Sequence, residues 1–244
     1  MICKNCKTEF SGNFCNNCGQ PANIKRITFK YVLSRGLDAF DFQDGLLFTI
    51  KELSLRPGKA IYNYIKDKRF IYYNPLKYYL LLGAIFFFLN LKFNIFDFES
   101  FVPENYTEKQ ALFYDRFLSF FFRYFNLIIL TIVPFFSFFS FLLFRKKKFN
   151  FSENMILNIY LLGHHSFIDI ILVPFLLVFK LDTIILMQLY SVIGLIYHSW
   201  AFIQFFKVSV FVGIIKTFFT FILGFFCWFI AFIASVLVYA KVFM

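Results

Sequence analysis

Residues 125–148 read FNLIILTIVPFFSFFSFLLF followed by RKKK, and this stretch decides the fold class. A predominantly apolar run of about 20 residues is the length that a helix needs to cross the hydrocarbon core of a bilayer. Pro134 is tolerated inside such a run because neighbouring helices can satisfy the freed backbone group. The basic tetrad that follows is typical of the cytoplasmic end of a spanning helix. We therefore predict a transmembrane helix at Phe125–Phe144.

Four further apolar runs surround this one. They are Leu76–Phe93, Met155–Phe179, Thr183–Phe206 and Val208–Ala240. The last run is too long for one straight span, and we expect Lys216 to divide it into an interfacial segment and a helix from about Thr217. The prediction is an all-α integral membrane helix bundle with about five transmembrane helices.

The composition supports lipid as the surrounding medium. Of 244 residues, 60% are hydrophobic, 16% are charged and 43 are Phe, whereas a soluble domain is about half apolar and about a quarter charged. One core of this size cannot bury so much apolar surface. The net charge of +11 comes from basic residues that flank apolar runs, rather than from a basic folded surface of the kind that binds nucleic acid. We therefore expect contacts with anionic lipid headgroups and no nucleic-acid partner.

Loop charge predicts the orientation. Residues 1–77 contain 13 Lys and Arg against 6 Asp and Glu, and Arg145–Lys148 is wholly basic. Basic loops stay in the cytoplasm, so we expect both regions there, with the first span serving as an uncleaved insertion signal. An odd number of spans then places Met244 outside. The loop expected outside is acidic, with Asp97, Glu99, Glu104 and Glu108.

The N-terminal segment contains a C-x2-C-x8-C-x2-C pattern formed by Cys3, Cys6, Cys15 and Cys18. Two C-x2-C turns can complete a tetrahedral site of four sulfurs, which is typical of structural zinc and leaves no open position for catalysis. Disulfides, redox chemistry and iron are alternatives, and a reducing cytoplasm favours zinc over disulfides. We predict a small zinc-ribbon knuckle at residues 1–21. Its turns are expected to need positive φ angles at Gly12 and Gly19. We expect the side chains of Phe10 and Phe14 to cover the metal.

Residues 22–75 are predicted to form cytoplasmic amphipathic juxtamembrane helices. Pro57 suits the first turn of a helix that extends through Ile65. An earlier helix is indicated by apolar residues at helical spacing, namely Phe29, Val32, Leu33, Leu37 and Phe40. We expect these helices to pack on the membrane domain, residues 76–244, and the alternative is a sensor of lipid composition.

Four ionisable residues lie inside the predicted spans: His164, His165, Asp169 and His198. Such residues are expensive in hydrocarbon and usually point inward at partners. His165 and Asp169 are four residues apart and share a helix face, so we expect both to point into the bundle. The cluster is either a structural hydrogen-bond network or a metal, proton-relay or substrate site.

Several motifs together resemble a bacterial membrane family labelled domain of unknown function 3667. They are the cysteine knuckle ending at Gln20, Arg56-Pro57-Gly58, Asp67-Lys68-Arg69-Phe70 with Asn74-Pro75, Glu153, and His164-His165-Ser166-Phe167. The resemblance implies a multi-pass protein of the bacterial cytoplasmic (inner) membrane and assigns no activity.

No nucleophile elbow, P-loop, zincin helix or dinucleotide fingerprint is present. We therefore expect a non-enzymatic scaffold or regulatory protein whose zinc ribbon docks a cytoplasmic partner. The alternative is a small transporter or channel component that uses the intramembrane His/Asp cluster.

Overall fold

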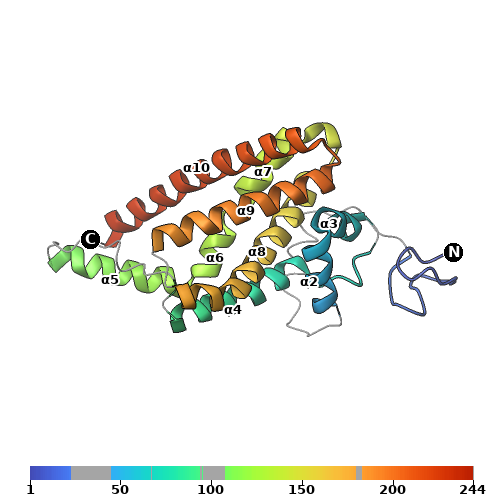
Figure 1. Cartoon of the computed structure of the whole chain (residues 1–244), viewed down its shortest axis with the longest axis horizontal. Helices are drawn as coiled ribbons and strands as arrows, with labels where there is room; N and C mark the ends of the chain where they lie inside the picture. The colour runs from blue at the N-terminus through green and yellow to red at the C-terminus, as the bar shows by residue number, and fades with distance from the viewer. Residues whose placement is uncertain (23–44, 67, 94, 96–107, 180–182, 244) are drawn as a thin grey trace.

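The computed structural model describes residues 1–22, 45–66, 68–93, 95, 108–179 and 183–243, and these residues form helices and two isolated β-bridges but no strand (Figure 1). Five helical segments among them are long and apolar enough to cross a membrane, which confirms the predicted number. These segments are α4 (Pro75–Phe93), α6 with α7 (Phe125–Leu130 and Val133–Leu143), α8 (Phe151–Phe179), α9 (Thr183–Phe206) and α10 (Val210–Phe243).

The second span is broken between α6 and α7. Pro134 lies in the first turn of α7 and has no N–H to donate, and its ring excludes the carbonyl of residue 130 from a regular helix. The break is tied to α10, because the indole Nε1 of Trp228 donates to Thr131 Oγ1 at 2.8 Å. A neighbouring helix thus supports the irregular backbone at this point.

The expectation that Lys216 divides the last span is wrong, because α10 is one continuous helix of 34 residues. Lys216 instead reaches sideways, and its Nζ donates to the Leu143 carbonyl oxygen at 2.7 Å and lies 5.1 Å from the centre of the Phe144 ring. A lysine can follow an apolar surface with its alkyl chain while its ammonium group finds carbonyls at a helix end. Lys216 therefore caps the end of α7 without interrupting α10.

The sequence did not predict helix α5, Glu108–Arg123, in what we expected to be an external polar loop. The C-terminal half of α5 lies beside the end of α10, where the rings of Phe120 and Tyr239 are 6.4 Å apart (Figure 1). A cavity of about 190 Å³ lies between α5, α6 and the end of α10, lined by Phe117, Phe120, Ile128, Phe232, Ser235, Val236 and Tyr239. Its charged and aromatic residues are mixed, so this helix contains no continuous apolar run of the kind that predicts a span.

Two short helices, α2 (Leu46–Leu55) and α3 (Pro57–Lys66), pack against the membrane domain. Pro57 begins α3, which extends through Ile65 as predicted. The main buried core joins these helices to α4, α8 and α9, and its members include Leu53, Ile61, Tyr64, Tyr78, Leu157, Tyr160, Phe202 and Phe205. The predicted helix with Phe29, Val32, Leu33, Leu37 and Phe40 lies outside the described residues.

Candidate metal centre and intramembrane histidines

The knuckle consists of two similar halves. The amide of Lys7 donates to the Cys3 carbonyl oxygen at 3.0 Å, and the amide of Gly19 donates to that of Cys15 at 2.8 Å. Lys7 and Gly19 have φ of 66° and 69°, so the same turn follows each C-x2-C pair. A glycine adopts this conformation freely, whereas a lysine does so at a cost. The predicted positive φ at Gly12 and Gly19 is confirmed.

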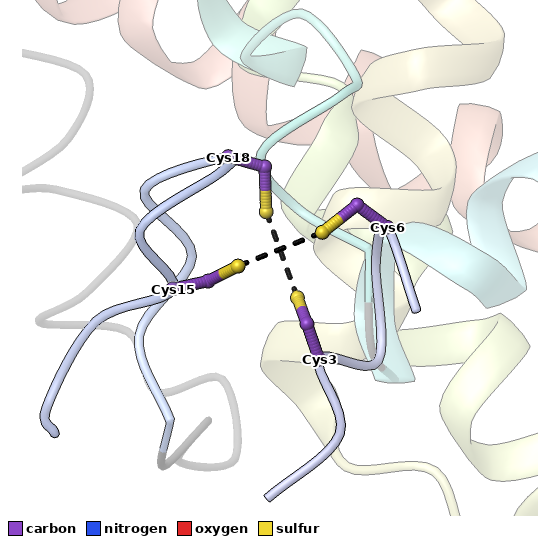
Figure 2. Close-up of side chains that lie close together, drawn as sticks. All are labelled: Cys3, Cys6, Cys15 and Cys18. Atoms are coloured by element: carbon purple, nitrogen blue, oxygen red, sulfur yellow. Dashed lines mark hydrogen bonds between the residues drawn. The ribbon is translucent and has the colours of Figure 1, made fainter. Parts of the chain in front are cut away.

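The two halves bring the four cysteine sulfurs together. Their Sγ atoms all lie within 4.8 Å of one another, and Figure 2 shows the four side chains pointing at a common centre. The distances across the centre are 3.6 Å from Cys3 to Cys18 and 3.5 Å from Cys6 to Cys15. Sulfurs of a disulfide are about 2.05 Å apart, whereas metal–sulfur bonds of about 2.3 Å in a tetrahedron place sulfurs about 3.8 Å apart. All four thiols are free, and the arrangement fits a metal site.

Local hydrogen bonds favour the thiolate at two of these sulfurs. The pKa of Cys3 is lowered, mainly because the backbone N–H of Cys6 points at its sulfur. The pKa of Cys6 is lowered to about 5, mainly because of the side-chain hydrogen bond between its sulfur and Thr8 Oγ1, 3.4 Å apart. Burial instead raises the pKa of Cys18 to about 11. Thiolates are the metal-binding form of cysteine, so local hydrogen bonds already favour metal binding at the two cysteines of the first half.

The prediction that Phe14 covers the metal site is wrong. Phe10 is buried beside Cys3 and Cys15, but Phe14 is 61% exposed. Phe14 immediately precedes Cys15, and its counterpart in the first half, Ile2, is also exposed. Each half of the knuckle therefore presents one apolar side chain outward.

The intramembrane residues fall into two groups, and the first contains His164 alone. Its Nε2 lies 3.2 Å from Ser54 Oγ in α2, and its Nδ1 lies 2.8 Å from the Tyr78 hydroxyl in α4. The ring stacks against that of Tyr197 with centroids 5.2 Å apart. His164 therefore joins α2, α4, α8 and α9 at the side of the bundle where the α2–α3 hairpin packs.

The second group lies between α8 and α9. His165 Nε2 lies 3.3 Å from the Tyr190 carbonyl oxygen and 3.7 Å from Asp169 Oδ1. His198 Nδ1 lies 2.8 Å from the Gly194 carbonyl oxygen, and its ring is 6.1 Å from that of His165. Asp169 and His198 are buried and His165 is partly buried, so the structure brings three of the four residues together.

Two polar residues of α8 that are close to these histidines in the sequence, Tyr160 and Ser166, bond backbone carbonyl oxygens. The Tyr160 hydroxyl donates to the Tyr73 carbonyl oxygen at 2.6 Å. Ser166 Oγ donates to the Leu162 carbonyl oxygen of its own helix at 3.4 Å. Neither bond involves the histidines.

Sequence reasoning also missed a polar ladder between α7 and α8. Asn158 Nδ2 lies 3.2 Å from Ser137 Oγ and 3.3 Å from Ser140 Oγ. Ser140 Oγ in turn donates to Asn154 Oδ1 at 2.9 Å. All four side chains are buried. The signal available in the sequence was two asparagines four residues apart in an apolar run, a spacing that puts them on one helix face.

Glu153, part of the family resemblance, lies in the first turn of α8. Its Oε2 accepts the amide of Asn150 at 2.8 Å, and its own amide donates to Asn150 Oδ1 at 2.7 Å. This reciprocal pair is a capping box, which satisfies orphan N–H groups at a helix start. The geometry gives Glu153 a role in starting the helix.

Residues 44–87 match the family described as Protein of unknown function (DUF3667). The match supports the resemblance found in the sequence and covers the α2–α3 hairpin, the loop after it and the first part of α4. No curated protein and no solved structure matches the chain.

Proposed function

We propose that this chain, whose residues 44–87 match the DUF3667 family, is a membrane scaffold or regulatory protein whose zinc-loaded knuckle docks a cytoplasmic partner. The observation that carries the proposal is the pairing of a four-sulfur site with two outward apolar side chains, Ile2 and Phe14. Four protein sulfurs leave a zinc ion no open position, so the metal would supply folding energy rather than catalysis.

The hydrogen bonds of the membrane domain support a non-enzymatic function. The side chains of His164, Asn154 and Asn158 are engaged in hydrogen bonds between helices. Networks of this kind hold spanning helices together. The cavity of about 190 Å³ lies between α5, α6 and the end of α10, and none of its lining residues belongs to the histidine groups.

Charge supports a cytoplasmic location for the knuckle in a bacterial cytoplasmic membrane. Lys147 Nζ donates to the Lys207 carbonyl oxygen at 3.0 Å, and Lys66 Nζ lies 5.5 Å from the centre of the Phe149 ring. The basic residues of three segments thus gather at one end of the bundle, away from the end of α10 (Figure 1). This is the distribution expected of a cytoplasmic face that meets anionic headgroups.

Docking is tested by changing the outward side chains and leaving the sulfurs intact. The full chain is purified from native membranes as the native protein, as the double variant I2S/F14S and as the control N16A, which changes an exposed polar residue of the same knuckle. We expect a co-purifying protein with the native chain and the control, its loss with the double variant, and equal zinc content in all three. An identical set of co-purifying proteins in all three samples would overturn the proposal.

A further inference from the structure

Among the described residues, three carboxyl groups are almost fully buried, at Glu52 (4% exposed), Glu153 (1%) and Asp169 (6%). Burying a carboxylate is expensive unless donors compensate it. Glu52 accepts two bonds from the guanidinium of Arg56, at 2.9 and 2.6 Å. Glu153 accepts a backbone N–H in its capping box. Both groups therefore have the donors that an ionised carboxylate needs.

Asp169 differs from the other two. Its Oδ1 is buried and accepts no hydrogen bond from any part of the chain that the structure describes. The nearest cationic candidate is His165, whose Nε2 is 3.7 Å away, which is too long for a hydrogen bond. That nitrogen already lies 3.3 Å from the Tyr190 carbonyl oxygen. Because a carbonyl only accepts, Nε2 carries a hydrogen and directs it at Tyr190.

The backbone of α9 is shaped around this histidine. A Cβ at Gly194 would lie 3.1 Å from His165 Nε2, so the glycine leaves room for the ring. The other titratable neighbours are engaged with groups other than Asp169. His198 directs Nδ1 at the Gly194 carbonyl oxygen and is covered by Phe221 of α10, with ring centroids 4.8 Å apart. The remaining two groups are the Tyr190 phenol, packed against Phe86 of α4, and His164, bonded to Ser54 and Tyr78.

We propose that Asp169 and His165 form a proton-binding site inside the membrane domain, in which Asp169 carries the proton and His165 is neutral. A neutral carboxyl group needs far less compensation in hydrocarbon than a carboxylate does. A proton fits this site better than a calcium ion does, because calcium takes about 6–8 oxygen ligands and Asp169 supplies the one carboxyl group that the described residues bring to the site. The site is separate from the knuckle, so it extends beyond the proposed docking function and does not rest on it.

The test measures the protonation state directly. The full chain is placed in lipid nanodiscs at pH 7, and infrared spectroscopy records the C=O stretching band of protonated carboxyl groups. We expect one such group per chain to be lost in D169N, which keeps the side-chain shape. The matched control E153Q alters a buried carboxylate that has its own donor, and it should leave the band unchanged.

A second measurement removes any dependence on the folding of the variant. Carbon-13 labelling of aspartate carboxyl groups in the native chain should shift the same band, because the proton is on an aspartate. The proposal is overturned if the native chain shows no protonated carboxyl band at pH 7. It is equally overturned if the band persists in folded D169N or does not shift on labelling.

Discussion

At the scale of single residues, Gly58 lies at the closest approach between α3 and α9. A Cβ at this position would collide with the backbone carbonyl oxygen of Ala201 and the backbone nitrogen of Phe205. Backbone atoms in a packed helix cannot move aside as the end of a flexible side chain can. The Pro57-Gly58 pair thus has two physical tasks, since proline starts the helix and glycine lets it touch its neighbour.

Gly58→Ala should lower the melting temperature of the purified protein in detergent. Overpacking of this kind costs about 1–3 kcal/mol. Gly83→Ala serves as the control, because its Cβ would meet the side chain of Asn126, which can rotate. Equal melting temperatures for the two variants would show that α3 does not pack on α9 as described.

The cysteine ligands lead to a second prediction at this scale. Cys15→Ser should remove about one zinc per chain, because three thiolates and a hydroxyl hold zinc far less well than four thiolates. Helical content should persist, since Cys15 packs within the knuckle's own small cluster. Cys227→Ser, in α10, is the matched control and should retain its zinc. Undiminished zinc in Cys15→Ser would contradict the assignment.

At the scale of elements, α7 and α8 are joined by polar side chains rather than by apolar packing alone. Ser137 and Ser140 accept the amide hydrogens of Asn158 across the helix interface. In a membrane such bonds have no water to compete with them, and they contribute about 1 kcal/mol each. The ladder therefore sets the register between the broken second span and the third.

The double variant S137A/S140A should be measurably less stable than the native protein. Removing both hydroxyls leaves the Asn158 amide with the carbonyl of its own helix as its remaining partner in the described network. Ser191→Ala is the control, because that exposed hydroxyl bonds the Met187 carbonyl oxygen within α9. Thermal unfolding in one detergent compares the variants, and equal shifts would mean that the ladder does not hold α7 to α8.

At the scale of the whole molecule, five spans place the knuckle and the end of α10 at opposite ends of the bundle (Figure 1). The charge bias predicts that the knuckle end lies in the cytoplasm. Single cysteines at positions 104 and 146, on a background without native cysteines, report the orientation. A membrane-impermeant thiol reagent applied to intact cells should label position 104 and spare position 146. The reverse labelling pattern would refute the orientation.

Predictions from the sequence were correct for features that depend on residues close together in the chain. The spans followed from run length, because bilayer thickness sets the number of residues that a helix needs. The start of α3 followed from the fixed φ of Pro57. The expectations for Lys216 and Phe14 failed because each depends on what lies beside the residue in space, namely the end of α7 for Lys216 and open surroundings for Phe14.

By itself the sequence determined the class of the protein, its number of spans and the four sulfurs of the knuckle. These properties depend on hydrophobicity and on short spacings in the sequence, and neither depends on how the helices pack against one another. The tertiary structure alone decided how the polar residues are paired. His164 meets Ser54, 110 residues away, whereas its neighbour His165 meets Tyr190. Helical periodicity places a residue on a face, but the neighbour of that face is selected by close packing at positions such as Gly58 and Gly194.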